Sequence, residues 1–313
     1  MKVSFVINEP IQSASGGYKV VYTYANEMAR KGIEVKIYYH CRKDVLLSNY
    51  KLPIGIKLMI ARGLSAIGPK WFELDKKVGR KIITNICNNQ IEDADIIIAT
   101  AADTAKDVYA LDKRKGKKLY FIQGYEDWVM PVDELIATYK YDMRKIVVSR
   151  WLKKLVESYC DENVDCVLNG INRRVFYVKK SPEERKNKSI CMLYHDLESK
   201  GSKEGLEVIY RLKEKYPDLE AHLFGVVDQP SDLPSWISYT HNASQEQLCN
   251  IYNESMIYLC PSWNEGFGLT GAESMMCGCA LVSTATDGAK EYATDDTAFL
   301  CAVHDIDKMF QDC

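Results

Sequence analysis

The segment that most constrains the fold of this chain is residues 261–278, which read PSWNEGFGLTGAESMMCG. A short apolar run precedes it at residues 256–260, and another follows it at residues 280–283. Runs of this length that are apolar throughout are typical of parallel strands buried on both faces. The segment therefore predicts a strand, a loop, a helix and a second strand.

The loop and the start of the helix carry the residue types of a ligand site. Gly266 and Gly268 let the backbone approach a bound group closely, and we expect Thr270 to cap the helix, with free N–H groups aimed at an anion. Glu265 lies in the loop, and we expect Glu273 in the first helical turn, so that both carboxylates flank one small volume. A capping box would explain Glu273 without a ligand. A capping box does not explain Glu265, and binding and catalytic residues are often found in loops.

This segment resembles the E-x-F-G-x-x-x-x-E signature of the retaining glycosyltransferases of family 4, which have the GT-B fold. The resemblance implies that Glu265 lies at the donor sugar and that the Phe267 and Gly268 amides meet sugar and phosphate. It also implies that Glu273 holds the ribose of the nucleotide. The flanks resemble the family too: SQEQLCNIYNESMIYLCPS upstream, and TDGAKEY downstream, where Glu291 takes the place of the family's G-x-x-E glutamate. The donor-binding residues expected in this segment are Phe267, Gly268, Leu269, Thr270 and Glu273.

Length and charge exclude several classes of protein. The chain has 313 residues, enough for two domains of ordinary size. Its 41 basic and 43 acidic residues provide no general attraction to nucleic acid. No run approaches the ~20 apolar residues that span a bilayer, and the N-terminus lacks the pattern of a secretory signal. We therefore expect a cytoplasmic location, including the inner face of the cell membrane.

The eleven cysteines have no regular spacing, and several lie in apolar runs, as Cys166, Cys191 and Cys260 do. Such cysteines are typically reduced, buried thiols. Cys277 and Cys279 could form a metal pair, but there is no second pair at zinc spacing. A helix end that turns into a strand is the favoured interpretation.

The first half of the chain begins with a βαβ unit. A strand at residues 2–7 is followed by a loop at 8–17, a helical pattern from residue 20 and a strand at 34–39. Such units wind into parallel sheets with ligands at the carboxyl edge. The G-x-G-x-x-G pattern of nicotinamide enzymes is absent. The loop ends in Gly16 and Gly17, which a tight turn would also need; the resemblance implies that they face a cleft near phosphate and acceptor. Further strands are predicted at 94–100, 118–123, 145–149 and 164–168.

Residues 120–128, YFIQGYEDW, leave a predicted strand and present polar groups at its carboxyl end, Glu126 among them. Gln123 can hydrogen-bond a sugar hydroxyl but cannot shuttle protons at neutral pH. Many family members have a histidine near this point, which this chain lacks. The sequence of residues 120–126 resembles that of some bacterial rhamnosyltransferases of the family. Tyr125 is an expected acceptor or sugar contact, and for Tyr125 and Trp128 a hydrophobic lid and a sugar-stacking role fit equally well.

Two segments in the first half of the chain resemble functional sites. Asp93 and Asp95 imitate the D-x-D metal motif of another glycosyltransferase fold, but they precede a predicted strand, at the edge opposite the expected site. Solvated strand-end charge is favoured, and no metal is expected. Residues 68–85 mix basic and aromatic residues; a solvated helix face is favoured over a basic amphipathic segment on an anionic bilayer.

The second half has its own series of strands after a polar, linker-like segment at residues 181–189. Residues 168–172, LNGIN, resemble the family's crossing to the second domain. We expect an acceptor-side Rossmann-like domain at residues 1–175 and a donor domain at 176–313, lacking the usual final crossing helix. Strands are predicted at 190–195, 220–225, 237–241, 256–260, 280–283 and 298–302, and helices at 203–215, 245–253 and 306–312. The expected fold is α/β with GT-B architecture: two doubly wound parallel-sheet domains facing across a cleft.

Lys200 and Lys203 follow the first strand of the second domain. A lysine at the entrance to a helix suits a diphosphate, because a point charge stands beside free backbone donors. The family usually has an arginine a few residues earlier, where this chain has Tyr194 and His195. We expect Lys200, with Glu265, to be catalytic and Lys203 to contact the donor; both lysines could also be ordinary surface residues.

The resemblance implies transfer of a hexosyl or deoxyhexosyl group from a nucleotide-diphosphate sugar to a hydroxyl, with retention of configuration and without metal or cofactor. The expected acceptor is a glycan or a lipid-linked glycan, as in cell-surface polysaccharide or glycolipid assembly, and a peripheral membrane contact would suit it. Two alternatives stay open. One is a nucleotide-sugar epimerase of the same fold, and the other is a non-catalytic nucleotide-sugar-binding partner.

Overall fold

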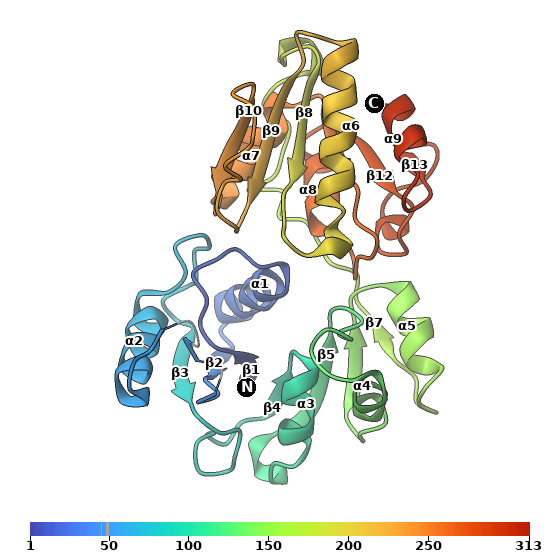
Figure 1. The fold of residues 1–313 in the computed structure, drawn as a ribbon. Helices are drawn as coiled ribbons and strands as arrows, with labels where there is room; N and C mark the ends of the chain where they lie inside the picture. The colour runs from blue at the N-terminus through green and yellow to red at the C-terminus, as the bar shows by residue number, and fades with distance from the viewer. Residues whose placement is uncertain (45, 48–49) are drawn as a thin grey trace. The chain divides into compact units, whose positions relative to one another are not determined.

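The computed structural model describes residues 1–44, 46–47 and 50–313. The described chain divides into two compact units, Met1–Leu168 and Asn169–Cys313 (Figure 1). The sequence suggested a boundary between residues 175 and 176, inside the second unit. Each unit is a parallel sheet with helices in most of the connections between its strands.

Unit 1 contains a seven-stranded sheet in the order β3-β2-β1-β4-β5-β6-β7, with every neighbouring pair parallel. The order reverses between β1 and β4, which makes the carboxyl ends of these two strands a switch point where ligands commonly bind. The strands are β1 Lys2–Asn8, β2 Glu34–His40, β3 Gly79–Ile83, β4 Ile96–Ala99, β5 Lys117–Ile122, β6 Arg144–Val147 and β7 Asp165–Cys166. The helices are α1 Gly16–Arg30, α2 Ile54–Ile67, α3 Ala102–Tyr109, α4 Val132–Tyr139 and α5 Arg150–Glu157, with the short 3-10 turn η1 Lys113–Lys115.

Unit 2 contains a six-stranded parallel sheet in the order β10-β9-β8-β11-β12-β13, with its switch point between β8 and β11. The strands are β8 Ser189–Leu193, β9 Glu220–Gly225, β10 Ile237–His241, β11 Ile257–Cys260, β12 Ala280–Thr284 and β13 Phe299–Cys301. The helices are α6 Ser202–Lys215, α7 Gln245–Glu254, α8 Leu269–Met276 and α9 Ile306–Asp312, with the short turns η2 Pro182–Glu184, η3 Glu198–Lys200 and η4 Ala289–Glu291. All six strands predicted for this half are present.

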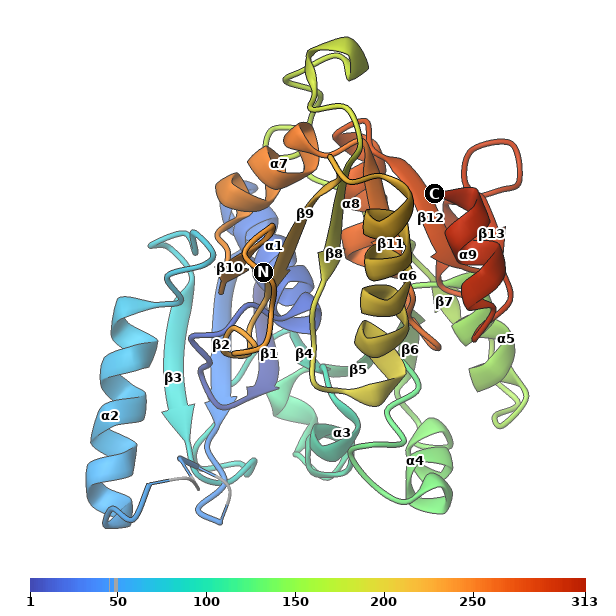
Figure 2. The same cartoon turned by 45° about the horizontal axis from the view of Figure 1, so that its top comes forward.

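The sheet of unit 2 is covered on both faces, which explains why its strands are apolar throughout. Met192 of β8 packs in one buried cluster with Val208 of α6 and Met309 of α9. Its neighbour Cys191 points to the other face and packs with Tyr252 of α7. Figure 2 shows α6 and α9 side by side on one face. The alternation of side chains along each strand thus builds two cores.

Two local predictions differ from the structure, and one helix was not predicted. Residues 68–85 contain turns and the strand β3, where a helix face was expected, because Trp71 and Phe72 are buried against Tyr22 of α1. Helix α2 was not predicted. Helix α1 begins at Gly16, so Gly16 and Gly17 form its first turn and are not part of the preceding loop.

Other local predictions are confirmed. Cys277 caps α8, and β12 begins three residues later, so the two cysteines lie where a helix end turns into a strand. Asp93 and Asp95 precede β4 at the amino edge of the sheet, where Asp93 pairs with Lys115 and Asp95 accepts a hydrogen bond from the Lys2 amide.

None of the helices among the described residues is long and apolar enough to cross a membrane.

Candidate functional site

Two loops of unit 2 meet at the carboxyl edge of its sheet. The first connects β8 to α6 and the second connects β11 to α8. The Trp263 amide donates a hydrogen bond of 2.7 Å to the Ser199 carbonyl. Gly201 has a φ of 65° and lies so close that a Cβ there would stand 2.1 Å from the Pro261 carbonyl oxygen. Only glycine therefore fits at position 201, and the contact fixes one loop against the other.

The closest charged contact between these loops joins Lys200 and Glu265. The Lys200 Nζ lies 2.8 Å from Glu265 Oε1, and the two side chains are 24% and 14% exposed. A charge-assisted bond in this partly buried setting is stronger than a surface ion pair. The loop after β12 packs on the other side, where a Cβ at Gly288 would stand 2.3 Å from the Glu265 carbonyl oxygen. Glu265 and Lys200, both expected in the site, are thus brought together.

Helix α8 begins differently from the prediction. Its N-cap is Gly268, in the left-handed conformation with φ 85°, and its first residue is Leu269. Thr270 is therefore the second helical residue and does not cap the helix; its hydroxyl bonds to the phenol of Tyr258. Glu273 lies just beyond the first turn and is only 2% exposed. The glycine makes the earlier start possible, because it adopts this φ without steric cost.

Tyr292, which the sequence did not single out, closes the start of α8. Its hydroxyl donates a hydrogen bond of 2.8 Å to the Gly268 carbonyl, and its ring packs on Phe267 with centroids 5.3 Å apart. Burial raises the pKa of Tyr292, and electrostatic interactions with Cys260, Glu265 and Glu273 raise it further. Both glutamates thus act electrostatically on the Tyr292 phenol, and the prediction that their carboxylates flank one small volume stays a prediction. Tyr292 follows Glu291 in the sequence, but no local pattern indicates this distant contact.

His195 is, with Tyr194, one of the two residues at the place where the resembled family usually has an arginine. Its Nδ1 accepts a hydrogen bond of 2.9 Å from the Leu197 amide, which requires this nitrogen to be unprotonated. Burial lowers the pKa of His195, and the charge of Lys200 lowers it further. The imidazole is thus neutral at pH 7, and Lys200 supplies the positive charge beside Glu265. Lys203 is exposed in the first turn of α6.

In unit 1, two residues expected at the acceptor or phosphate side are in contact. The Gln123 Nε2, just after β5, donates a hydrogen bond of 3.3 Å to the Gly17 carbonyl in the first turn of α1. Tyr125 is half-buried and Trp128 is 69% exposed. The amide of Gln123 therefore connects the carboxyl end of β5 to the start of α1.

Glu126 is the most perturbed acid at this edge of unit 1. Its Oε2 accepts a hydrogen bond of 2.6 Å from the Ala102 amide at the start of α3. Burial raises its pKa to about 7, and the Asp103 charge adds to the rise while the amide bond opposes it. A carboxylic acid that exchanges its proton near neutral pH is a typical feature of functional sites. The sequence placed Glu126 among the polar groups after a predicted strand, but no sequence pattern indicated that its carboxyl group would be buried.

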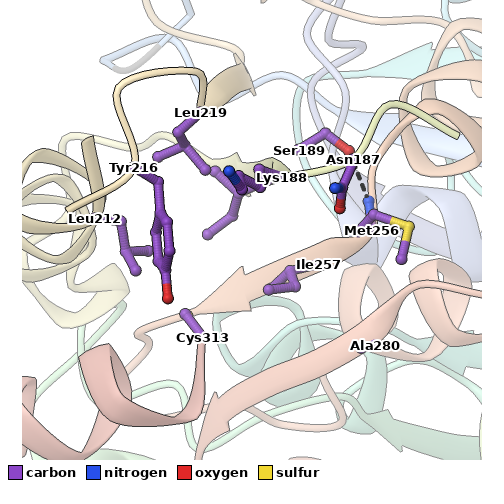
Figure 3. Close-up of a pocket in the computed structure, with 11 residues that line it drawn as sticks. Asn187, Lys188, Ser189, Leu212, Tyr216, Leu219, Met256, Ile257, Ala280 and Cys313 are labelled. Atoms are coloured by element: carbon purple, nitrogen blue, oxygen red, sulfur yellow. Dashed lines mark hydrogen bonds between the residues drawn. The ribbon is translucent and has the colours of Figure 1, made fainter. Parts of the chain in front are cut away.

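The described residues contain no group of three or more His, Cys, Asp or Glu side chains that could hold a metal ion. A pocket of about 320 Å³ opens at the opposite, amino edge of the unit 2 sheet, where β8, β11 and β12 begin (Figure 3). Leu212, Tyr216 and Leu219 form an apolar wall of this pocket. The expected site residues lie at the other edge.

Comparisons with known proteins support one family of activities. Residues 174–311 match the family model described as Glycosyl transferases group 1. No curated protein sequence matches the chain. Solved structures are similar over nearly its whole length.

The first is sucrose-phosphate synthase from Thermosynechococcus elongatus, with a TM-score of 0.69, 14% identity, and coverage of 99% of this chain and 88% of that chain. The second is a TarM mutant from S. aureus in complex with fondaparinux, alpha-GlcNAc-glycerol and UDP, with a TM-score of 0.74, 10% identity and coverage of 99% and 91%. The third is the pneumococcal O-GlcNAc transferase GtfA in complex with UDP and GlcNAc, with a TM-score of 0.68, 12% identity and coverage of 99% and 90%.

These identities are low, so the structures show the fold alone. The expected α/β class, with two doubly wound parallel sheets, is confirmed. The group 1 match in unit 2 and the fold of the whole chain together support a glycosyltransferase of the GT-B fold.

Proposed function

We propose that this chain is a retaining glycosyltransferase. It would move a hexosyl or deoxyhexosyl group from a nucleotide-diphosphate sugar to a hydroxyl of a glycan or lipid-linked acceptor, in cell-surface polysaccharide or glycolipid assembly on the cytoplasmic side. The observation that carries the proposal is the ion pair of Lys200 and Glu265 at the carboxyl edge of the unit 2 sheet. The complexes of TarM and GtfA with UDP support a nucleotide donor.

The reaction breaks the anomeric C–O bond, so negative charge develops on the diphosphate and positive charge on the sugar. Lys200 and the start of α6 would stabilise the first charge, and Glu265 the second. Without donor the two side chains neutralise each other. A bound diphosphate would compete for Lys200 and leave the Glu265 carboxylate free to face the sugar. The ion pair would thus keep the site electrostatically balanced until the donor arrives.

The remaining donor contacts would come from the start of α8. The backbone amides of Phe267 and Gly268 would meet the sugar and the phosphate, and Glu273 would hold the ribose. Leu269, Thr270 and Lys203 complete the proposed donor set. Glu273 is only 2% exposed, so its side chain has little freedom to move.

In unit 1, Gln123 and Tyr125 would contact the acceptor or the sugar, and Gly16 and Gly17 would approach the phosphate. The hydrogen bond between Gln123 and Gly17 supports a common role. We expect the chain to need neither metal nor cofactor, because Lys200 and helix amides supply the positive field that the leaving group requires.

The first test is a thermal-unfolding screen of the whole chain with nucleoside diphosphates and their sugars. A ligand that binds only the folded state raises its apparent stability, by about 2.7 kcal/mol at a hundred times its dissociation constant. The stabilising donor is then incubated with candidate acceptors, and NMR of the first product reports the anomeric configuration. Retention supports the proposal, whereas inversion contradicts it. Epimerised donor formed without acceptor would favour the epimerase.

A further inference from the structure

Helix α2 carries an apolar face on its outer side. Surface helices normally turn polar residues toward solvent and apolar residues toward the core. The core-facing side of α2 holds Ala61 and Ser65, both buried. The opposite side exposes Ile56, Met59 and Ile67, which are 41%, 64% and 77% exposed. Apolar residues scattered singly over a surface are common. Three large apolar side chains on one outward face form a patch, and such patches often mark interaction sites.

The borders of this face are basic. With about 100° of rotation per residue, Lys57 and Arg62 fall on opposite sides of the strip formed by Ile56, Met59 and Ile67. Lys51 precedes the helix and Lys70 follows it, and no Asp or Glu lies between residues 50 and 72. The chain as a whole is slightly acidic, with a formal net charge of −2, so this run of positive charge is a local feature.

The position of α2 leaves this face accessible within unit 1. The helix packs beside β3, the edge strand of the sheet (Figure 2). Its inner residues rest on a small cluster that contains Cys41 and Leu46. The helix thus has its own support on one side, and the outward residues are not needed for that packing.

We propose that α2 docks unit 1 on the surface of an anionic lipid bilayer. The apolar strip would enter the boundary between head groups and acyl chains, and Lys57 and Arg62 would reach the phosphates with their flexible stems. A second copy of the chain fits less well, because packing α2 against α2 would bring like charges together. The proposal concerns another surface than the donor site and does not rest on it.

The proposal also changes where a membrane contact is placed. The sequence suggested the basic segment at residues 68–85 as the candidate. The structure buries Trp71 and Phe72 of that segment in unit 1, where they cannot reach lipid. The preceding helix exposes the apolar side chains instead.

The test is flotation of the full chain with vesicles of phosphatidylcholine alone or with about one-third phosphatidylglycerol. We expect binding to the anionic vesicles only, and loss of binding as salt rises, since screening weakens the attraction. Met59→Asp with Ile67→Asp should abolish binding. Lys57→Glu with Arg62→Glu should lower partitioning about fivefold or more for each cation removed.

Matched controls separate this surface from general effects. Val178→Asp with Phe299→Asp changes two exposed apolar residues of unit 2, and Lys106→Glu with Lys113→Glu reverses two exposed lysines of unit 1. Both controls should bind like the wild type. A Met59→Trp variant, whose extra fluorescence should shift to the blue with anionic vesicles, tests the contact without an added charge.

Several results would overturn the proposal. They are absence of binding by the wild type, equal binding to neutral vesicles, α2 variants that bind like the wild type, or no blue shift from Trp at position 59. An oligomer in analytical ultracentrifugation that the α2 variants convert to a monomer would assign the face to self-association. Donor binding, measured in parallel by thermal unfolding, should be unchanged in every α2 variant, so failure here leaves the proposed function intact.

Discussion

The hydroxyl of Tyr292 donates a hydrogen bond to the Gly268 carbonyl and occupies the space where a side chain at residue 271 would stand. A Cβ built at Gly271 would lie 2.3 Å from the Tyr292 oxygen. The tyrosine follows η4, whereas both glycines belong to the start of α8. One phenol thus holds the segment after β12 against the helix that carries Glu273, and the absence of a side chain at residue 271 makes room for it.

This contact predicts the effect of Gly271→Ala. Alanine normally stabilises a helix interior by about 0.5–1 kcal/mol relative to glycine, but here the methyl group would collide with the phenol. Overpacking of this kind typically costs about 1–3 kcal/mol, so we expect the unfolding free energy to fall. Gly63→Ala in α2, where a Cβ meets open space, is the control and should be neutral or stabilising.

The double variant tests the cause. Tyr292→Phe removes the hydroxyl and its bond to Gly268, which should cost about 1 kcal/mol by itself. Combined with Gly271→Ala it should recover part of the loss, because the colliding oxygen is gone. A double-mutant cycle in urea measures this coupling. Strictly additive effects would show that the phenol does not restrict position 271.

Glu126 predicts a pH dependence of stability. Its pKa is raised to about 7 in the folded state from an ordinary value near 4.5, so the folded chain binds more protons between these values. The contribution of Glu126 to stability should therefore be largest below the lower value and should fall as pH rises through the window. Glu126→Gln keeps an oxygen for the Ala102 amide but cannot ionise, and should remove this fall.

The measurement is the unfolding free energy at several pH values between 5 and 8. The difference between wild type and Glu126→Gln should change by on the order of 2–3 kcal/mol across the window. Asp133→Asn, an exposed acid in α4, serves as the control and should keep the wild-type dependence. Parallel curves for wild type and Glu126→Gln would mean that Glu126 titrates normally.

Lys200 and Lys203 should differ in their effect on donor binding. Lys200 lies beside Glu265, whereas Lys203 is an exposed residue of the first turn of α6. Calorimetry of Lys200→Met should show at least about a tenfold weaker nucleoside diphosphate affinity, as expected for a lost charged hydrogen bond. Lys203→Met should weaken the affinity less than Lys200→Met does, because the exposed Lys203 side chain is screened by solvent. The reverse ranking would move the phosphate contact to Lys203.

Much of the fold follows from the sequence because buried parallel strands are apolar throughout. The predicted ranges 220–225 and 237–241 coincide with β9 and β10, and residues 306–312 with α9. Strand β3 escaped prediction because its sequence, GRKII, mixes charge with apolar residues, as suits the edge of a sheet. Helix α2 escaped because apolar residues occur all around it, which hides the periodicity of an amphipathic helix.

The site was predictable only where its parts are close in the sequence. The order of residues in 261–278 indicated Glu265 and Glu273 as candidates, and a site shared by their two carboxylates stays a prediction. The pairing of Lys200 with Glu265 depends on contacts between distant loops, such as Gly201 with Pro261. The cap of α8 was assigned to Thr270 from its side chain, whereas the backbone freedom of Gly268 decides where the helix starts.

The most direct test of the account is turnover and nucleotide affinity of Glu265→Gln. The substitution keeps the size of the side chain, removes the charge proposed to face the sugar, and releases Lys200 for the diphosphate. We expect turnover to fall at least about a hundredfold, while the nucleoside diphosphate binds as tightly as to the wild type or more tightly. Turnover at the wild-type rate, or loss of nucleotide binding by a folded variant, would contradict the proposed role of this ion pair.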